Sequence, residues 1–178
     1  LFEFTERFDG CKLDANHIRV TQVEIKEAYR KIDEEQLQVI RKAIHNIEAS
    51  PTKQKQYSWF DSTSNGTILG QKVTPIEAVG VYVPGGKAAY PSSVLMNVIP
   101  AKVAGVSKII MTTPPNKDGE VYEGTLVAAN EAGVDEIYKV GGAQAIAALS
   151  FGTESIPKVD KVVGPGNIYV ALAKKAVY

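Results

Sequence analysis

Residues 80–93 read Gly-Val-Tyr-Val-Pro-Gly-Gly-Lys-Ala-Ala-Tyr-Pro-Ser-Ser, and this stretch decides the fold. A β-branched run leads into a glycine turn, and a helix-like run follows. The same order recurs around Gly141-Gly142 and around residues 164–166, so three glycine turns each end a short strand pattern. Open α/β sheets bind their ligands at such strand ends, and glycine lets the backbone approach a ligand closely. The pattern predicts a nucleotide-type pocket.

Strand patterns alternate with helix patterns over the rest of the chain. Strands are expected at 79–83, 108–112, 136–140 and 159–163, and helices at 120–132, 143–151, 167–177 and from Ser92 or Ser93 to Ala104 with a kink or break at Pro100. Such alternation is typical of βαβ units. It predicts an α/β fold with a Rossmann-like, mostly parallel sheet and helices on both faces. Right-handed crossovers would bring the three glycine turns to one edge.

The first part of the chain is patterned differently. Two capping boxes, Thr21 with Glu24 and Asp33 with Gln36, predict two amphipathic helices. The second helix is expected to end at Ser50-Pro51, because a residue before proline avoids the helical region. A loop is expected at 61–66, with extended runs at 67–73 and 76–83 on either side of Pro75.

These patterns divide the chain into two parts. Residues 1–79 are interpreted as a helical segment and an extended pair belonging to a neighbouring domain. Residues 80–178 are interpreted as a Rossmann-like domain that is truncated at its C-terminal end. The chain stops inside a helical pattern at Tyr178 and does not begin with Met, so we expect an internal fragment of a longer protein.

Composition excludes several classes of protein. Apolar residues make up 44% and charged residues 22% of the chain, which is ordinary for a globular protein. The formal net charge is zero, which argues against a nucleic-acid partner. No apolar run approaches the roughly 20 residues of a membrane span. The single Cys11 favours a reducing cytoplasm, and His17 and His45 stand without a second ligand at metal-binding spacing.

Neither standard phosphate-binding fingerprint is present. The chain contains no Gly-x-Gly-x-x-Gly and no Gly-x-x-x-x-Gly-Lys-Ser/Thr. Spacing alone therefore leaves two interpretations open: the glycines line a ligand pocket, or they only make tight βα turns.

Several motifs resemble histidinol dehydrogenases. The motifs are Val-Gly-Val-Tyr-Val-Pro-Gly-Gly at 79–86, Tyr-Pro-Ser-Ser-Val-Leu-Met at 90–96, Pro-Ala-Lys-Val-Ala-Gly-Val at 100–106, Val-Gly-Gly-Ala-Gln-Ala-Ile-Ala-Ala-Leu at 140–149, and the run from Phe151 through Val-Gly-Pro-Gly-Asn at 163–167. Upstream, residues 7–10 and 66–71 extend the resemblance over nearly the whole chain. The resemblance implies a zinc-dependent homodimer that oxidises L-histidinol through the aldehyde to L-histidine with two NAD, at the end of histidine biosynthesis.

The resemblance also implies site residues. The NAD contacts of the family correspond to Tyr82, Gln144 and Asn167. Tyr82 offers an aromatic face and a hydroxyl at a strand end, and the two amides stand where helices begin and free N–H groups favour anions. The alternative for Gln144 and Asn167 is that they only cap their helices. The turns have no nearby arginine to meet a 2′-phosphate, so NAD is expected to be preferred to NADP.

The resemblance places no catalytic residue and no zinc ligand within this chain. The zinc ligands and the proton-transferring Glu-His pair of the family correspond to positions beyond Tyr178, so these residues alone are expected to be catalytically silent. The segment Ser50-Pro51-Thr52 also stands where many members carry Phe-His-Glu. Two other classes stay open: an aldehyde-dehydrogenase-like enzyme, which would need a nucleophilic cysteine, and a non-catalytic NAD-binding module.

Overall fold

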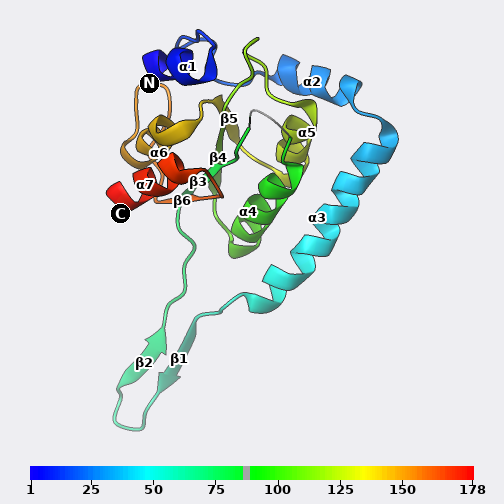
Figure 1. Ribbon diagram of the computed structural model, residues 1–178. Helices are drawn as coiled ribbons and strands as arrows, with labels where there is room; N and C mark the ends of the chain where they lie inside the picture. Colours follow the sequence, from blue (N-terminus) through cyan, green and yellow to red (C-terminus); the bar gives the residue numbers. More distant parts are fainter. Residues whose placement is uncertain (86–88) are drawn as a thin grey trace.

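The computed structural model describes residues 1–85 and 89–178, and its centre is a four-stranded parallel sheet (Figure 1). The strands are β3 (Ala78–Tyr82), β4 (Lys108–Thr113), β5 (Glu136–Lys139) and β6 (Lys161–Val163). They are hydrogen-bonded in the order β5-β4-β3-β6, all parallel. The predicted α/β fold with a parallel sheet is therefore confirmed.

Helices cover both faces of this sheet (Figure 1). The helices α4 (Pro91–Ala104) and α5 (Glu123–Ala132) share one apolar cluster with Val81 and Met111. The helices α6 (Gly142–Phe151) and α7 (Ile168–Ala176) share another with Tyr82 and Ile110. Because side chains alternate along a strand, neighbouring residues such as Val81 and Tyr82 enter opposite clusters, and each face of the sheet has its own core.

The strand order marks a binding crevice. In chain order within the sheet, β3 is the first strand, β4 the second, β5 the third and β6 the fourth, so the spatial order is 3-2-1-4. This is the start of the doubly wound order, which reverses between its first and fourth strands. Ligands of open α/β sheets bind outside the carboxyl ends of the strands at that reversal. Here the reversal lies between β3 and β6.

The two N-terminal capping boxes form as predicted. Thr21 caps α2 (Gln22–Lys31) and Asp33 caps α3 (Glu34–Gln54), with both reciprocal hydrogen bonds present in each. Both helices pack against the sheet domain, and their Ala28 and Ile40 join the apolar cluster on the α4–α5 side. The assignment of residues 1–79 to a neighbouring domain stays a prediction.

A polar network ties α2 and α3 to α5. The hydroxyl of Tyr29 donates to Glu131 Oε1 at 2.6 Å and accepts from Asn130 Nδ2 at 2.9 Å. From α3, Arg41 Nε donates to Glu131 Oε2 at 2.8 Å. One carboxylate therefore receives donors from two helices, which fixes their position on α5.

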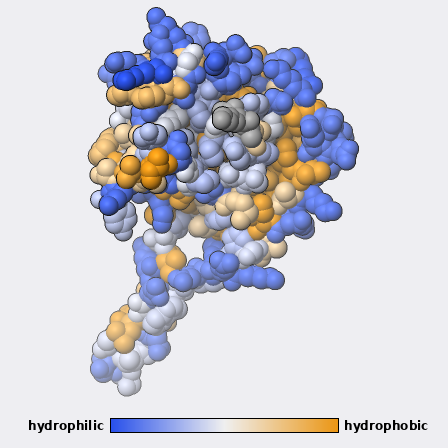
Figure 2. Space-filling model, viewed as in Figure 1, coloured by the Kyte–Doolittle hydropathy of each residue, from blue (hydrophilic) through white to orange (hydrophobic). Residues whose placement is uncertain are grey.

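A hairpin projects from the body of the protein (Figures 1 and 2). It consists of β1 (Trp59–Ser62) and β2 (Ile68–Gln71), paired antiparallel. The loop predicted at 61–66 is therefore too long, because residues 61 and 62 belong to β1. The strand β1 itself was not predicted. All eight residues of the two strands are exposed, so no buried alternation marks them in the sequence.

Two helix boundaries and one expected interior break differ from the prediction, each at a proline. The helix α3 continues through Pro51 to Gln54, because the φ of proline is compatible with a helix and its missing N–H costs only one bond, in the last turn. The hydroxyl of the next residue, Thr52, also donates to the Glu48 carbonyl at 2.7 Å. The helix α4 begins at Pro91, not after a serine cap, because proline is preorganised for a first helical position. It runs unbroken through Pro100.

The remaining elements agree closely with the pattern. The helix α5 begins three residues later than predicted, at Glu123, and ends at Ala132 before Gly133 as expected. A short helix, α1 (Phe2–Asp9), precedes α2 and was not predicted. None of the helices in residues 1–85 and 89–178 combines the length and apolar character needed to cross a membrane.

Candidate functional site

The described parts of the three glycine turns lie on one edge of the sheet. Gly85, Gly141 and Gly164 follow the carboxyl ends of β3, β5 and β6, which are parallel. Gly85 and Gly141 both pack on Pro114, which follows β4: a Cβ at either position would lie 2.9 Å and 2.5 Å, respectively, from Pro114 side-chain atoms. The convergence predicted from sequence is confirmed for these residues, while Gly86 lies outside the described residues.

Gly164 lies where the turn after β6 meets the end of β3. Its φ is 106°, a conformation that only glycine adopts readily. A Cβ at this position would overlap the backbone carbonyl of Tyr82. The turn after β6 can therefore press against the end of β3 only because residue 164 has no side chain.

Tyr82 lies at the centre of this edge. It is 3% exposed, and its hydroxyl accepts a hydrogen bond from the backbone N–H of Gly142 at 3.2 Å. Burial raises the pKa of Tyr82, so the phenol stays protonated and its O–H remains available as a donor. The residue thus links the end of β3 to the first turn of α6.

Gln144 does not cap its helix. No side chain caps α6, so the capping explanation for Gln144 is wrong. Its amide lies against Gly142, beside the Tyr82 hydroxyl, and its Nε2 is buried without a hydrogen-bond partner among the described residues. A buried donor without an acceptor is unfavourable, which makes this amide a good candidate for binding a ligand.

Asn167 does cap its helix. Its Oδ1 accepts from the backbone N–H of Val170 at 3.1 Å at the start of α7. The capping interpretation is therefore confirmed for this residue, and any contact with a cofactor would come in addition to the cap. Asn167 is exposed at the end of the Gly164 turn, so its amide can reach a ligand there.

Sequence reasoning missed a lysine that supports the same turn. Lys174 Nζ donates to the carbonyl oxygen of Gly164 at 2.6 Å, and burial lowers the pKa of Lys174. Lys174 lies two turns into α7, and helical side chains lean toward the N-terminus. Because the Lys174 side chain leans toward the start of α7, its ammonium group reaches the turn after β6.

Cys11 is a buried thiol and His17 is a surface side chain. Cys11 is buried against Gly119, and burial raises the pKa of its thiol, which disfavours the thiolate an aldehyde-dehydrogenase-like enzyme would need. His17 is exposed and contacts Asp14 through Nδ1 at 2.7 Å. Within the described ranges, no group of three or more His, Cys, Asp or Glu side chains is arranged to hold a metal ion.

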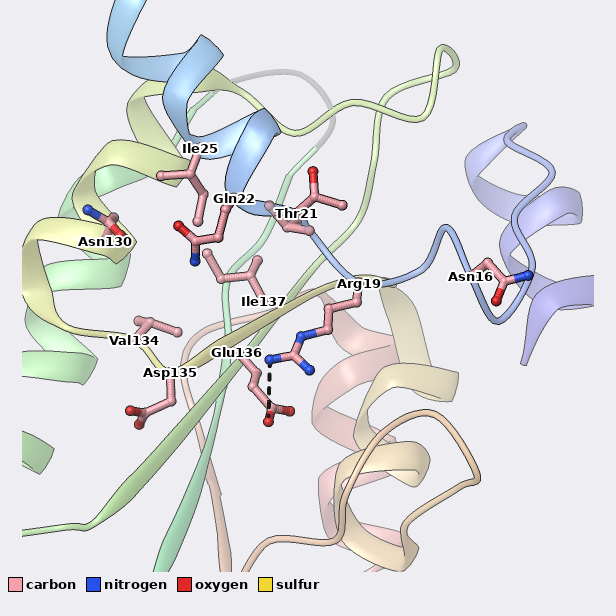
Figure 3. Close-up of a pocket in the computed structure, with 11 residues that line it drawn as sticks. Asn16, Arg19, Thr21, Gln22, Ile25, Asn130, Val134, Asp135, Glu136 and Ile137 are labelled. Carbon is pink, nitrogen blue, oxygen red and sulfur yellow. Dashed lines mark ion pairs between the residues drawn. The ribbon is translucent and has the colours of Figure 1, made fainter.

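A separate pocket of about 320 Å³ lies away from the glycine turns, between the start of α2 and β5 (Figure 3). Arg19 crosses it to meet Glu136 at 3.6 Å, and Lys108 meets the same carboxylate at 3.1 Å. Glu136 is the first residue of β5, so this pocket is at the opposite end of that strand from Gly141. Each charged side chain that lines it has an ion-pair partner, Arg19 with Glu136 and Asp135 with Lys102, and we assign no ligand to it.

Known proteins agree with this architecture. The profile of the histidinol dehydrogenase family matches residues 1–178. Histidinol dehydrogenases of Geobacillus kaustophilus and Halalkalibacterium halodurans are 63% and 60% identical over the whole chain, which covers 42% of each. The crystal structure of histidinol dehydrogenase from Elizabethkingia anophelis superposes with a TM-score of 0.93 at 42% identity, covering 99% of this chain and 40% of that one. The chain thus spans under half the length of these relatives, and it belongs to the histidinol dehydrogenase family.

Proposed function

We propose that these residues form the NAD-binding part of an enzyme that oxidises L-histidinol through the aldehyde to L-histidine. The relatives named above are histidinol dehydrogenases, which supports the reaction. The cofactor assignment is supported by the crevice between β3 and β6 and by the glycine turns along the same edge. The observation that carries it is the unpartnered, buried Nε2 of Gln144 beside the Tyr82 hydroxyl.

The residues present fit a dinucleotide. The first turns of α6 and α7 lie at this edge, and those of their backbone N–H groups that are not bonded to Tyr82 or Asn167 favour the phosphates of an anionic ligand. Gly141 and Gly164 let their turns pack closely on Pro114 and on the Tyr82 backbone, which shapes this edge. Tyr82 and Gln144 add polar groups, and Asn167 can contribute its amide. When bound, NAD accepts the hydride from the substrate; these residues bind and orient it.

The described residues do not fit a zinc ion. They contain no candidate cluster of metal ligands, and we assign neither a zinc ligand nor a proton-transferring residue to this chain. We propose that those groups lie elsewhere in the full-length protein, as the family resemblance implies.

The proposal also includes a cytoplasmic homodimer. The free, buried thiol of Cys11 is typical of a reducing compartment. Trp59, Phe60, Ile68 and Leu69 are each more than half exposed on the projecting hairpin. Apolar surfaces of this kind commonly mark protein–protein interfaces, so the hairpin supports an interface between subunits.

Calorimetric titration with NAD tests the cofactor assignment directly. We expect saturable binding of NAD to the purified protein. In parallel, the full-length protein with zinc should produce two reduced nicotinamides for each L-histidinol. The absorbance of the reduced nicotinamide measures this ratio. A protein that binds NAD without oxidising histidinol would be a non-catalytic NAD-binding module. Absence of NAD binding would refute the cofactor assignment itself.

Replacing Gln144 by alanine should weaken NAD binding. The substitution removes the polar contacts of the amide, and we expect a loss on the order of 1–2 kcal/mol in binding free energy. The fold should persist, because alanine suits a helix. Gln38→Ala, an exposed glutamine of α3, is the matched control and should bind NAD like the wild type. Equal affinity in the two variants would contradict the role of Gln144.

A further inference from the structure

The turn that follows β6 has no backbone hydrogen bonds to hold its shape. Residues 164–166 read Gly-Pro-Gly, so two of the three positions are conformationally free and Pro165 has no N–H to donate. In the described part of the chain, no backbone–backbone hydrogen bond reaches any of the three. The conformation of this tripeptide must therefore be fixed by side chains that pack around it.

The helix α7 fixes the turn at three points. A Cβ at Gly166 would overlap the buried side chain of Val170, so the end of the turn packs closely on the helix. Asn167 caps the helix through the backbone N–H of the same Val170. The beginning of the turn is held by Lys174, whose ammonium group donates to the carbonyl oxygen of Gly164 at 2.6 Å. Among the described residues, this is the one hydrogen bond made to the tripeptide.

The surroundings of Lys174 strengthen this bond. The side chain is half-buried, and burial lowers the pKa of Lys174. Within residues 1–85 and 89–178, no carboxylate acts on its charge to oppose this shift. A hydrogen bond from a charged donor is shorter and stronger than a neutral one. The ammonium group is therefore not shared with an acid, and it holds the Gly164 carbonyl firmly.

The turn belongs to the proposed cofactor site. Gly164 lies against the backbone of Tyr82 at the end of β3, where the strand order reverses. A loop that already has its bound conformation loses less entropy when a ligand binds, so the ligand binds more tightly. A glycine-rich turn gains most from this preorganisation, because without support it would sample many conformations.

We propose, on the basis of the proposed NAD-binding function, that Lys174 is a positioning residue for the cofactor, which fixes the Gly-Pro-Gly turn through the Gly164 carbonyl. Lys174 acts through the turn and does not need to touch NAD itself. Its contribution is therefore to the affinity for NAD and not to the hydride-transfer step. In this it differs from Gln144, whose amide is proposed as a direct contact.

Lys174→Met in the full-length protein tests this role. Methionine keeps an unbranched side chain in the half-buried position, and the partly exposed Gly164 carbonyl can bond to water instead, so the melting temperature should change little. The calorimetric Kd and the KM for NAD should both rise about tenfold. The kcat at saturating NAD should stay within about twofold of the wild type. Lys174→Arg keeps a charged donor and should recover most of the affinity.

Lys175→Met is the matched control, because Lys175 is the exposed neighbour on the same helix. It should bind NAD like the wild type. Provided that the wild type binds NAD, wild-type affinity in Lys174→Met, an equal loss in Lys175→Met, or an arginine variant as weak as the methionine variant would overturn this inference. A lower melting temperature and kcat with an unchanged KM for NAD would also overturn it, since the lysine would then only support the fold. A wild type that binds no NAD would instead overturn the proposed function.

Discussion

Replacing Gly164 by alanine is expected to destabilise the protein by about 3–5 kcal/mol and to abolish NAD binding. Two effects add at this position. The φ of 106° is unfavourable for any residue with a Cβ, and that Cβ would collide with the backbone carbonyl of Tyr82. The Tyr82 carbonyl lies at the end of β3, next to the Val81–Val163 pair and opposite Thr112, so it cannot move aside without disturbing the pairing of β3 with its neighbours. Urea denaturation followed by circular dichroism measures the loss.

Two other glycines separate the cost of the positive φ from the cost of the collision with Tyr82. Gly66 has a φ of 85° but no atom within 4 Å of its virtual Cβ, so Gly66→Ala should show only the backbone term, about 1–2 kcal/mol. Gly124 lies in α5 with open space and no positive φ, so Gly124→Ala should be neutral or stabilising. If Gly164→Ala were no worse than Gly66→Ala, the close contact with Tyr82 would not be a constraint on the fold.

The second large effect is expected at the ion pair between Lys139 and Glu24. Lys139 Nζ lies 2.9 Å from Glu24 Oε1, with 8% of the lysine side chain and 33% of the glutamate side chain exposed. Glu24→Gln leaves a buried ammonium group without its counterion, and we expect a loss of about 3 kcal/mol in the free energy of unfolding. Lys139→Met should be milder, because Glu24 keeps its hydrogen bonds to Thr21 and partial access to water.

A surface pair on the same helix provides the comparison. Glu27 and Arg30 form an ion pair in which both side chains are largely exposed, so Glu27→Gln should change stability by less than about 1 kcal/mol. Denaturant titration of Glu24→Gln, Lys139→Met and Glu27→Gln ranks the three variants by their free energy of unfolding. A Glu24→Gln variant as stable as Glu27→Gln would show that the pair does not hold α2 to the end of β5.

The same pair makes stability depend on pH. Burial alone would raise the pKa of Glu24, but hydrogen bonds from Thr21 and Lys139 outweigh it, and the pKa lies below its ordinary value of 4.5. A group with a lowered pKa in the folded state stabilises the fold above its unfolded pKa. The difference between wild type and Glu24→Gln should therefore be full at neutral pH and shrink as the pH falls below about 4.5. A difference that stayed constant to pH 3 would contradict this.

Much of the site could be predicted from sequence because its signals are local. A capping box spans four residues, so Thr21 and Asp33 predicted the starts of α2 and α3 correctly. Strand runs followed by glycine predicted the turns at Gly141 and Gly164, and parallel pairing then required them to share an edge. Tyr82 was placed at a strand end for the same reason. These conclusions need only the order of elements along the chain.

Other features depend on packing between distant segments, and only the tertiary structure decided them. Gln144 and Asn167 stand at equivalent places in the sequence, yet Asn167 caps its helix while the amide of Gln144 is buried without a partner. The Tyr82 hydroxyl meets the backbone N–H of Gly142, 60 residues away along the chain, because the end of β3 and the start of α6 share one edge of the sheet. Whether a polar group is satisfied depends on every segment that surrounds it, and the sequence near that group does not contain this information.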